Sequence, residues 1–555
     1  MFRSSEEDKQ LDIFTSIPGM LKGTSQKKFN DPKAWHNIFR SYVLENIDEQ
    51  LFTPLFNNTA GAPNASVKVL MGMMILKEAF GWSDSDLFEQ CRFNLLVRSS
   101  LGLHNINDSL PVESTYYLLR KRIHDYYKQK NIDLIEEVFQ QVTGSQVMEF
   151  KVRGGSIRMD SKLIGSNIAF STRYEIVHET LVLFYKEILR TGVKKVSKKI
   201  IVQLKTLSEQ NSNKIVYESV GEQIHERLEE LGFLCYKLLK AYKEKDNKHY
   251  ITLERVFEDN YTHRDGGILV KPSKEVKADS VQSAHDTECA YRNKDGQPSV
   301  KGYSINATET CDKGSLNLIT DIQLAAANKP DTDFVKPAIQ ATTNVLDHKP
   351  KALHADGAFN SPDNVKYCEQ ENINHYFSAV AGLAGRYDLE MIDGKPSVID
   401  TKTGQVMNVY KTKSGKWGIK TEKGHRYFSE HNFETSMLRK QIDKVPKYLR
   451  NKRNNVEATI FQLSYHSRNN KTRYRGAFKN KSWAILRSMW VNLRRICNYI
   501  EDNYANAGPI ALALKSNWPF LQKINPSRFI FKFLYSLFNY FKKSYYYHLQ
   551  INPIY

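Results

Sequence analysis

The sequence contains no C-x-x-C pair, and its six cysteines stand far apart along the 555 residues. Structural zinc sites and disulfide frameworks need closely spaced or regularly paired cysteines, so neither kind of site is indicated. The first eight residues lack the apolar core of a signal peptide. We therefore expect a reduced, cytoplasmic protein.

Long hydrophobic runs are also missing. The most apolar stretch, residues 529–541, is interrupted by Lys532 and is shorter than the about 20 residues that span a bilayer. We expect no membrane anchor. Residues 501–555 are interpreted as a basic, aromatic C-terminal tail, either helical or loosely ordered.

Acidic residues are scarce in the last part of the chain. Residues 439–555 hold 22 Lys and Arg but only 4 Asp and Glu, which accounts for +18 of the net charge of +19. Solvated surface lysines explain some of this excess. An imbalance of this size nevertheless favours contact with the phosphates of nucleic acid.

Against this basic background, two aspartates stand in patterns typical of strands. Asp160 lies in the alternating run 156–164, which predicts a strand with the carboxylate projecting from it. Asp356 follows a second strand-like run and precedes Ser361, which can cap a helix opened by a proline. Ligands collect at such strand ends in open α/β sheets.

A third acid lies on a predicted helix. Residues 448–463 carry Arg453 and Glu457 four positions apart, hence on one helix face. Carboxylates are the usual protein ligands of Mg²⁺ and Mn²⁺, and two such ions can hold the attacking and leaving oxygens of a phosphodiester. Three acids in a basic chain therefore suggest metal-dependent chemistry on nucleic acid.

The pattern of apolar residues predicts the chain's organisation. We expect residues 1–145 to form a helical domain, either a helix-turn-helix-like DNA-binding module or an ordinary helical bundle. Residues 150–500 read as a sheet-containing domain, with strands at about 301–308 and 316–324 and a helix at 335–346. Its two expected insertions are a long helical hairpin at about 174–262, with apolar seams, and a small antiparallel meander at about 385–428, with turn signals roughly every ten residues.

These residues resemble the DDE-type transposases of bacterial insertion sequences, over most of the chain from about residue 60 to 500. Asp160 resembles the first acid of that family's triad, and the Ala-Asp-Gly-Ala-Phe run around Asp356 resembles the second. Glu457 resembles the third, with Arg453 in the place of the Arg in the signature Tyr-x2-Arg-x3-Glu-x6-Lys. Residues 283–294, followed by Gly302-Tyr303, are similar to a stretch that these transposases carry between the two aspartates.

The chain departs from the signature at two positions. Arg450 stands where the signature has Tyr, although Tyr448 is close by, and Ser464 stands where it has Lys. The missing Lys leaves open which cation contacts DNA near the cleaved end. Nearby basic residues that could replace it are Arg468, Lys471, Arg473 and Arg475.

The resemblance implies an α/β fold: an RNase H-like mixed-sheet catalytic core with a helical and a small β insertion, preceded by an all-α N-terminal domain. Asp160 and Asp356 are 196 residues apart, and Glu457 follows 101 residues later. Such a sheet needs far less chain than the first interval, so the helical insertion would account for the excess. The three acids would be both catalytic and metal-binding, with two Mg²⁺ or Mn²⁺ ions. The DNA-binding residues would be Arg453, Arg450, Arg468, Lys471, Arg473 and Arg475.

The implied activity is strand cleavage at the ends of a mobile element and transfer of those ends into target DNA. The partners would be double-stranded DNA, namely terminal inverted repeats and a target, and a second copy of the chain in the DNA complex. The location would be the bacterial nucleoid. Two alternatives remain open: a DNA-binding protein derived from a transposase that no longer transposes, and a related metal-dependent nuclease without strand transfer.

Overall fold

The computed structural model describes residues 2–4, 15–57, 63–192, 195–219, 221–244, 246–264, 267–293, 296, 298–379, 385–392, 394–422 and 424–506. The chain divides into two compact units, residues 1–496 and 497–555, and the fold and site described below belong to the first. The predicted C-terminal tail falls largely outside the described residues. In the described part of the chain, no helix is both long and apolar enough to span a bilayer.

The N-terminal part is helical, as predicted, and its centre is α4 (Val67–Phe80). Only Lys68 and Phe80 of this helix escape full burial, so its neighbours must surround it. Ser66 caps its start and Gly81, with φ +69°, ends it. The other helices of this part are α1 (Ile17–Met20), α2 (Gly23–Phe29), α3 (Trp35–Phe39), the π-helix η1 (Arg40–Leu44), the 3₁₀-helix η2 (Glu49–Leu55), α5 (Asp84–Phe93), α6 (Leu95–Ser100), α7 (Glu113–Lys130) and α8 (Leu134–Glu149).

A six-stranded mixed sheet follows. The strands are β1 (Ser156–Gly165), β4 (Ala290–Arg292), β5 (Val300–Thr310), β6 (Ile319–Ala326), β7 (Ala352–Ala355) and β8 (Asn374–Phe377). Their order is β4-β5-β1-β7-β8, with β6 also paired to β5. β1 runs antiparallel to β5 and parallel to β7, which is parallel to β8. The predicted strands around residues 301–308 and 316–324 are therefore confirmed.

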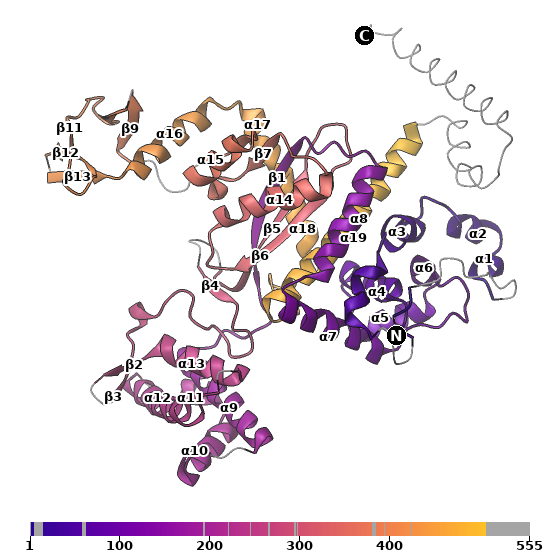
Figure 1. The fold of residues 1–555 in the computed structure, drawn as a ribbon, viewed down its shortest axis with the longest axis horizontal. Coiled ribbons are helices and arrows are strands. Elements are labelled where there is room, and N and C mark those ends of the chain that lie inside the picture. The colour runs from indigo at the N-terminus through magenta and orange to yellow at the C-terminus, as the bar shows by residue number, and fades with distance from the viewer. Residues whose placement is uncertain are drawn as a thin grey trace, which may run out of the picture. The chain divides into compact units, whose positions relative to one another are not determined.

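Two layers of helices cover the sheet. Alternate residues of β1, Ile157 and Met159, are buried on the face covered by α14 (Val335–Leu346) and α15 (Pro362–Gln370). On the other face, Lys162 of β1 contacts α18 (Asn455–Ser464), and Asn492 of α19 (Ala477–Asn506) bonds the backbone of Ile319 in β6. Figure 1 shows these two helices beside the strands. Helices thus lie on both faces of the sheet around β1, with Arg158, Asp160 and Lys162 half-buried on the second face.

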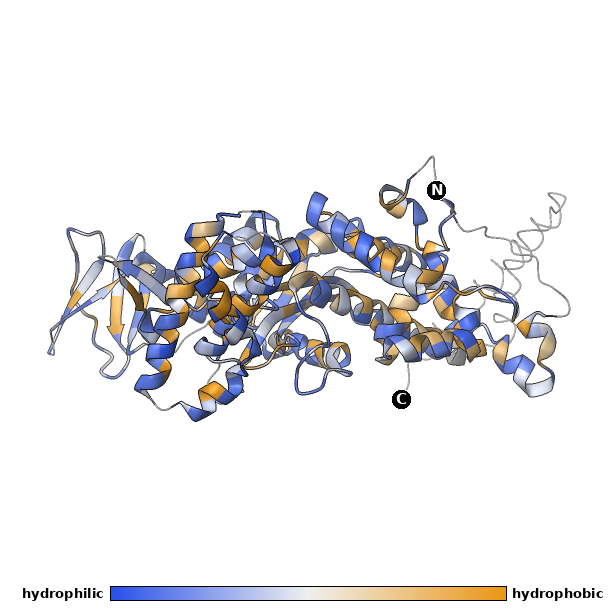
Figure 2. Ribbon diagram, turned by 90° about the horizontal axis from the view of Figure 1, so that it is seen from below, coloured by the Kyte–Doolittle hydropathy of each residue, from blue (hydrophilic) through white to orange (hydrophobic). Residues whose placement is uncertain are grey.

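The region between β1 and β4 is helical, as predicted, but it is not a single hairpin. It contains α9 (Arg173–Thr191), α10 (Lys198–Glu209), α11 (Ser212–Glu218), α12 (Glu222–Tyr242), α13 (Lys248–Asn260), and the strand pair β2 (Tyr261–Arg264) and β3 (Gly267–Val270), followed by the short 3₁₀-helix η3 (Ser273–Glu275). Gly192 and Lys243, both at positive φ, end α9 and α12 and divide the predicted hairpin. The predicted seams are the buried faces of these two helices and build a core of their own. Along the helical ribbons of Figure 2, hydrophobic residues alternate with hydrophilic ones.

Five short antiparallel strands lie between residues 387 and 428, where a meander was predicted. They are β9 (Tyr387–Ile392), β10 (Lys395–Asp400), β11 (Val409–Lys411), β12 (Trp417–Thr421) and β13 (Gly424–Phe428), and they form two small sheets instead of one. Leu389, Val398 and Ile419 join the two sheets to Phe433 of α16 (Glu430–Lys444) in a small apolar cluster.

The predicted helix over residues 448–463 is broken in two. α17 (Lys447–Asn451) is followed by the 3₁₀ turn η6 (Lys452–Asn454) and only then by α18. Two further 3₁₀ turns, η4 (Asp331–Phe334) and η5 (Gly357–Phe359), precede α14 and α15. The predicted helix over residues 335–346 is confirmed.

The contact between β1 and β5 is so close at one point that only glycine fits. Gly302 pairs with Gly165, and a Cβ on Gly302 would lie 2.0 Å from the carbonyl oxygen of Ile164. We expect Gly302→Ala to lower the free energy of unfolding by at least about 2 kcal/mol, because backbone atoms must move. Gly144→Ala in α8 is the control: its nearest neighbour would be 3.6 Å away, so added helix propensity should stabilise by up to about 1 kcal/mol. Denaturant midpoints compare the two, and equal stability of both variants would contradict the close packing.

Candidate active site

The register of the central strands sets the two aspartates side by side. In the parallel pair, Ser156 lies opposite Ala352 and Arg158 opposite His354, an offset of 196 residues. The same offset carried two residues further brings Asp160 level with Asp356, where β7 ends. Because side chains alternate along a strand, Arg158 and Asp160 share one face.

Asp356 is held at the turn after β7. One of its carboxylate oxygens, Oδ1, accepts hydrogen bonds from the backbone N–H of Gly357, at 2.6 Å, and from the hydroxyl of Ser378, at 2.9 Å. The side chain is 43% exposed, and its second oxygen, Oδ2, faces the guanidinium of Arg453. The following α15 begins as predicted, with Ser361 as its cap and Pro362 in the first turn.

Arg453 lies between the second and third acids. Its guanidinium Nη1 is 3.9 Å from Asp356 Oδ2 and 3.8 Å from Glu457 Oε1. Glu457 is 64% exposed at the first turn of α18, where the positive end of the helix dipole favours an acid. The predicted pairing of Arg453 with Glu457 on one side of the chain is thus present, although the two belong to different helical elements.

Asp160 stands in the field of all three groups. Burial raises the pKa of its carboxyl to about 6, and the charges of Asp356 and Glu457 add to the rise. The N–H of Ser161, at 2.9 Å from Oδ1, and the charge of Arg453 act in the opposite direction. All three predicted acids and Arg453 therefore belong to one electrostatic cluster.

The donor chemistry of this cluster fits a hard divalent cation, since all three acids offer carboxylate oxygens. As the side chains are placed, however, no three His, Cys, Asp or Glu of the described residues converge closely enough to hold a metal ion. The guanidinium of Arg453 provides the positive charge between Asp356 and Glu457 instead.

Two residues of the sheet hold the segment that carries Arg453. His354 Nδ1 lies 3.1 Å from the carbonyl oxygen of Leu449 in α17, and Arg158 Nη1 donates to the carbonyl of Lys452 at 3.2 Å. Burial lowers the pKa of His354 to about 4, so its ring is neutral at physiological pH. These side chains take carbonyl groups that a continuous helix would use itself, which explains the break before α18.

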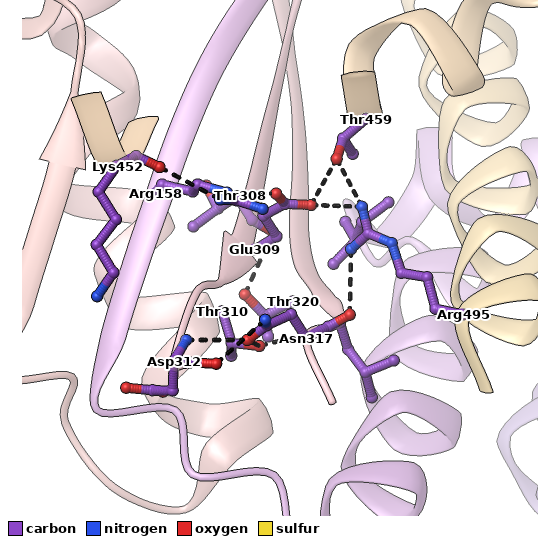
Figure 3. A network of polar contacts seen from close by, with 12 residues as sticks. Arg158, Thr308, Glu309, Thr310, Asp312, Asn317, Thr320, Lys452, Thr459 and Arg495 are labelled. Carbon is purple, nitrogen blue, oxygen red and sulfur yellow. Dashed lines mark hydrogen bonds and ion pairs between the residues drawn. The ribbon is translucent and has the colours of Figure 1, made fainter. Parts of the chain in front are cut away.

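A buried carboxylate joins the strand of Asp160 to the helix of Glu457 (Figure 3). Glu309 of β5 has a side chain with no solvent exposure, and it accepts from Arg158 Nε and from Arg495 Nη2, both at 2.6 Å. Its Oε2 also accepts from the hydroxyl of Thr459 in α18, at 2.7 Å. One acid thus ties together β1, α18 and α19 directly beneath the candidate site.

A direct hydrogen bond between β1 and α18 lies on the other side of Asp160. Lys162 Nζ donates to the hydroxyl of Ser464, at 2.9 Å. From Arg158 to Lys162, alternate residues of the strand therefore face successive parts of the segment from Lys452 to Ser464. Glu457 is positioned because the segment from Lys452 to Ser464 is fastened to the sheet on both sides of Asp160.

The other predicted DNA-binding residues differ in whether their charged groups already have partners in the protein. Lys471 Nζ donates to the carbonyl of Ile168 at 2.8 Å, and Arg475 Nε to that of Asn167 at 2.7 Å. Arg473 pairs with the buried Glu78 of α4 at 3.2 Å. Arg468 is exposed, and the side chain of Arg450 lies outside the described part of the chain.

The stretch at residues 283–294, of which 294 lies outside the described residues, has a structural role around Asp286. This buried carboxylate accepts from Ser166 Oγ at 2.5 Å, from Tyr303 Oη at 2.7 Å and from the backbone N–H of Gly476 at 2.8 Å. It thereby joins the end of β1, the start of β5 and the turn before α19.

Sequence reasoning missed the residues that hold the site together: Arg158, Lys162, Glu309, His354, Thr459 and Arg495. The strand period could have placed Arg158 and Lys162 on the face of Asp160. Glu309 stands in an otherwise uncharged stretch of β5. Because a carboxylate in a buried strand needs a partner, the sequence could have indicated that Glu309 is paired, although not with which residues.

Comparison with known proteins adds one finding. Residues 26–122 match the transposase domain family DUF772; this segment runs from within α2 to within α7. The match supports a transposase. No curated protein and no solved structure matches the chain.

The raised pKa of Asp160 gives a prediction about stability in the presence of a chelator. An unfolded Asp has a pKa near 3.9, so between about pH 4 and 6 the folded protein binds more protons than the unfolded chain. The free energy of unfolding therefore falls as pH rises through this window. We expect Asp160→Asn to be more stable than the wild type at about pH 8, by on the order of 2 kcal/mol, and the gain to disappear near pH 4. A gain independent of pH in chelator-treated thermal melts would contradict this account.

The Glu309 contacts predict a large loss of stability on a small change. Glu309→Gln keeps the size of the side chain but leaves Arg158 and Arg495 without their carboxylate, at a cost of about 3–5 kcal/mol. Denaturant unfolding measures it. Glu371→Gln is the matched control, because its partner Lys349 is well exposed, and its midpoint should stay unchanged. A Glu309→Gln protein as stable as this control would show that the network is dispensable.

Proposed function

We propose that the chain is a DNA transposase that cleaves strands at the ends of a mobile element and joins them to target DNA, with Asp160, Asp356 and Glu457 as its catalytic carboxylates. The observation that carries the proposal is the register that sets Asp160 level with Asp356, with Arg453 and Glu457 facing them from the α18 side. The match to a transposase domain over residues 26–122 supports it independently, since it covers none of these four residues.

The sheet supports an RNase H-like interpretation of the core. The first three long strands, β1, β5 and β6, are antiparallel neighbours. β7 and β8 come later in the chain, lie on the other side of β1 and run parallel to it. The first acid lies on the central strand and the second at the end of its parallel neighbour. This is the edge at which ligands of α/β sheets gather.

The proposed cofactor is a pair of Mg²⁺ or Mn²⁺ ions held by the three acids. When bound, such ions lower the pKa of an attacking water or 3′-hydroxyl and stabilise the departing oxygen. The chain's own residues prepare the site. Ser378 and the N–H of Gly357 fix Oδ1 of Asp356, while Oδ2 faces Arg453. Asp160, whose burial keeps its carboxyl protonated up to about pH 6, would be favoured as an anionic ligand when a cation occupies the site.

Arg453 has two roles in this proposal. In the free protein its guanidinium reduces the repulsion between Asp356 and Glu457. When DNA enters, the same group lies where a phosphate of the cleaved strand meets the acids, and a guanidinium can bind phosphate through two parallel hydrogen bonds. The two contacts at 3.8 and 3.9 Å are loose enough to exchange for a phosphate.

The decisive test removes each acid separately. Asp160→Asn, Asp356→Asn and Glu457→Gln should each reduce Mg²⁺-dependent strand cleavage to background without weakening DNA binding. The substrates are duplexes from the DNA that flanks the coding sequence, chosen for terminal inverted repeats. Asp363→Asn, an exposed acid in the first turn of α15, is the control and should cleave normally.

Cleavage that survives all three substitutions would refute the assignment of the acids. DNA binding without any metal-dependent cleavage by the wild type would favour the first alternative, a derived DNA-binding protein. Cleaved ends that never join a supplied target duplex would favour the second, a nuclease without strand transfer.

A further inference from the structure

β1, the strand that carries Asp160, contains one lysine, Lys162. It lies two residues beyond Asp160 on the same face, hence one strand repeat of about 7 Å away. Its ammonium ends against α18, at the hydroxyl of Ser464. The cation is therefore at the side of the site opposite to Arg158.

The charge of Lys162 has no counter-ion in the described residues. The side chain is half-buried, yet its one described polar partner is the neutral hydroxyl of Ser464. A partly buried cation without an acid is costly to maintain. Such a cost is offset when an anionic ligand occupies the site.

Ser464 is arranged to orient this ammonium. Its hydroxyl donates its hydrogen to the carbonyl of Ile460, at 3.0 Å, so an oxygen lone pair remains to accept from Lys162. One of the three N–H groups of the ammonium is then used, and two remain for a ligand. Lys471, Arg473 and Arg475 differ, because each already donates to a carbonyl or a carboxylate of the protein.

We propose that Lys162 binds the phosphate next to the scissile one on the cleaved strand, and that Ser464 holds its ammonium in place. The cation that the transposase signature carries at position 464 is thus supplied from β1, by a residue 302 positions earlier in the chain. This inference rests on the proposed function, since it places that phosphate by its distance from Asp160.

The test measures DNA binding, which is separate from cleavage. Lys162→Met removes the charge and keeps the apolar stem. It should weaken binding to the flanking-DNA duplex about tenfold and reduce the slope of log K against log salt by about 0.9, the loss of one phosphate contact. Lys162→Arg should retain most of the affinity. The double variant Lys162→Met with Ser464→Lys returns a cation to the same spot and should restore both affinity and slope.

Neutral methylphosphonates at single positions of the duplex identify the phosphate. The wild type should lose affinity at one position beside the cleavage point, and Lys162→Met should be indifferent to that replacement. Lys329→Met, at an exposed lysine after β6, is the matched control and should keep the wild-type profile. Thermal midpoints of Lys162→Met, Lys162→Arg and Lys329→Met should be similar, because Ser464 keeps its bond to Ile460 in all three.

Two results would overturn the inference. One is a Lys162→Met protein with wild-type affinity and salt slope; the other is a methylphosphonate profile that this substitution leaves intact. In either case the proposed function still stands if the wild type binds and cleaves DNA and Asp160→Asn abolishes the cleavage. If the wild type binds no duplex, the proposed function itself is refuted.

Discussion

The candidate site depends on one buried carboxylate. Glu309 has no exposure to water and faces two guanidinium groups, from Arg158 on the neighbouring strand and from Arg495 on α19. The carboxylate of Glu309 and the two guanidinium groups must be buried together, because an unpaired ion in a dry interior is strongly destabilising. The contacts of Glu309 therefore connect β1, β5, α18 and α19, among them the strand of Asp160 and the helix of Glu457.

The sheet also holds two of the three candidate acids in place. Asp160 is fixed by a strand paired on both sides, and Asp356 by the turn that ends a parallel neighbour. Glu457 is the exposed member, and its position derives from Thr459 and Ser464 further along its helix, which touch Glu309 and Lys162. Buried polar contacts thus surround an exposed reactive edge, which is how a rigid element can present a side chain that has few contacts of its own.

Local patterns predicted much of this site. Strand alternation placed Asp160, and the cap-and-proline pattern placed Asp356 at a strand end, because both signals lie within a few residues. The break between α17 and α18 was not predictable, since it arises from contacts of His354 and Arg158 with backbone carbonyls nearly 100 and 300 positions away in sequence. Glu309 and Ser464 could not be assigned for the same reason: their partners are distant in the chain and no local period links them.

The charge distribution along the sequence does not show which of the basic residues face solvent. The basic excess after residue 439 predicted phosphate contact, yet part of it is structural. Arg487 donates to the carbonyls of Glu78 and Ala79 at the end of α4 and to that of Leu463 in α18. Arg495 and Lys481 pair with Glu309 and Glu136. Composition counts such internal cations together with those that face solvent, and only tertiary structure separates them.

The helices between β1 and β4 have a further consequence for how such a protein can change. Their apolar side chains pack on one another, in a core distinct from the one beneath the sheet. The pairing of β1 with β5 and β7 is made by backbone groups that do not depend on how much chain lies between them. The positions of Asp160 and Asp356 therefore do not depend on the 196 residues of chain between them. A change in the length of this helical segment would therefore leave intact the backbone pairing that sets Asp160 level with Asp356.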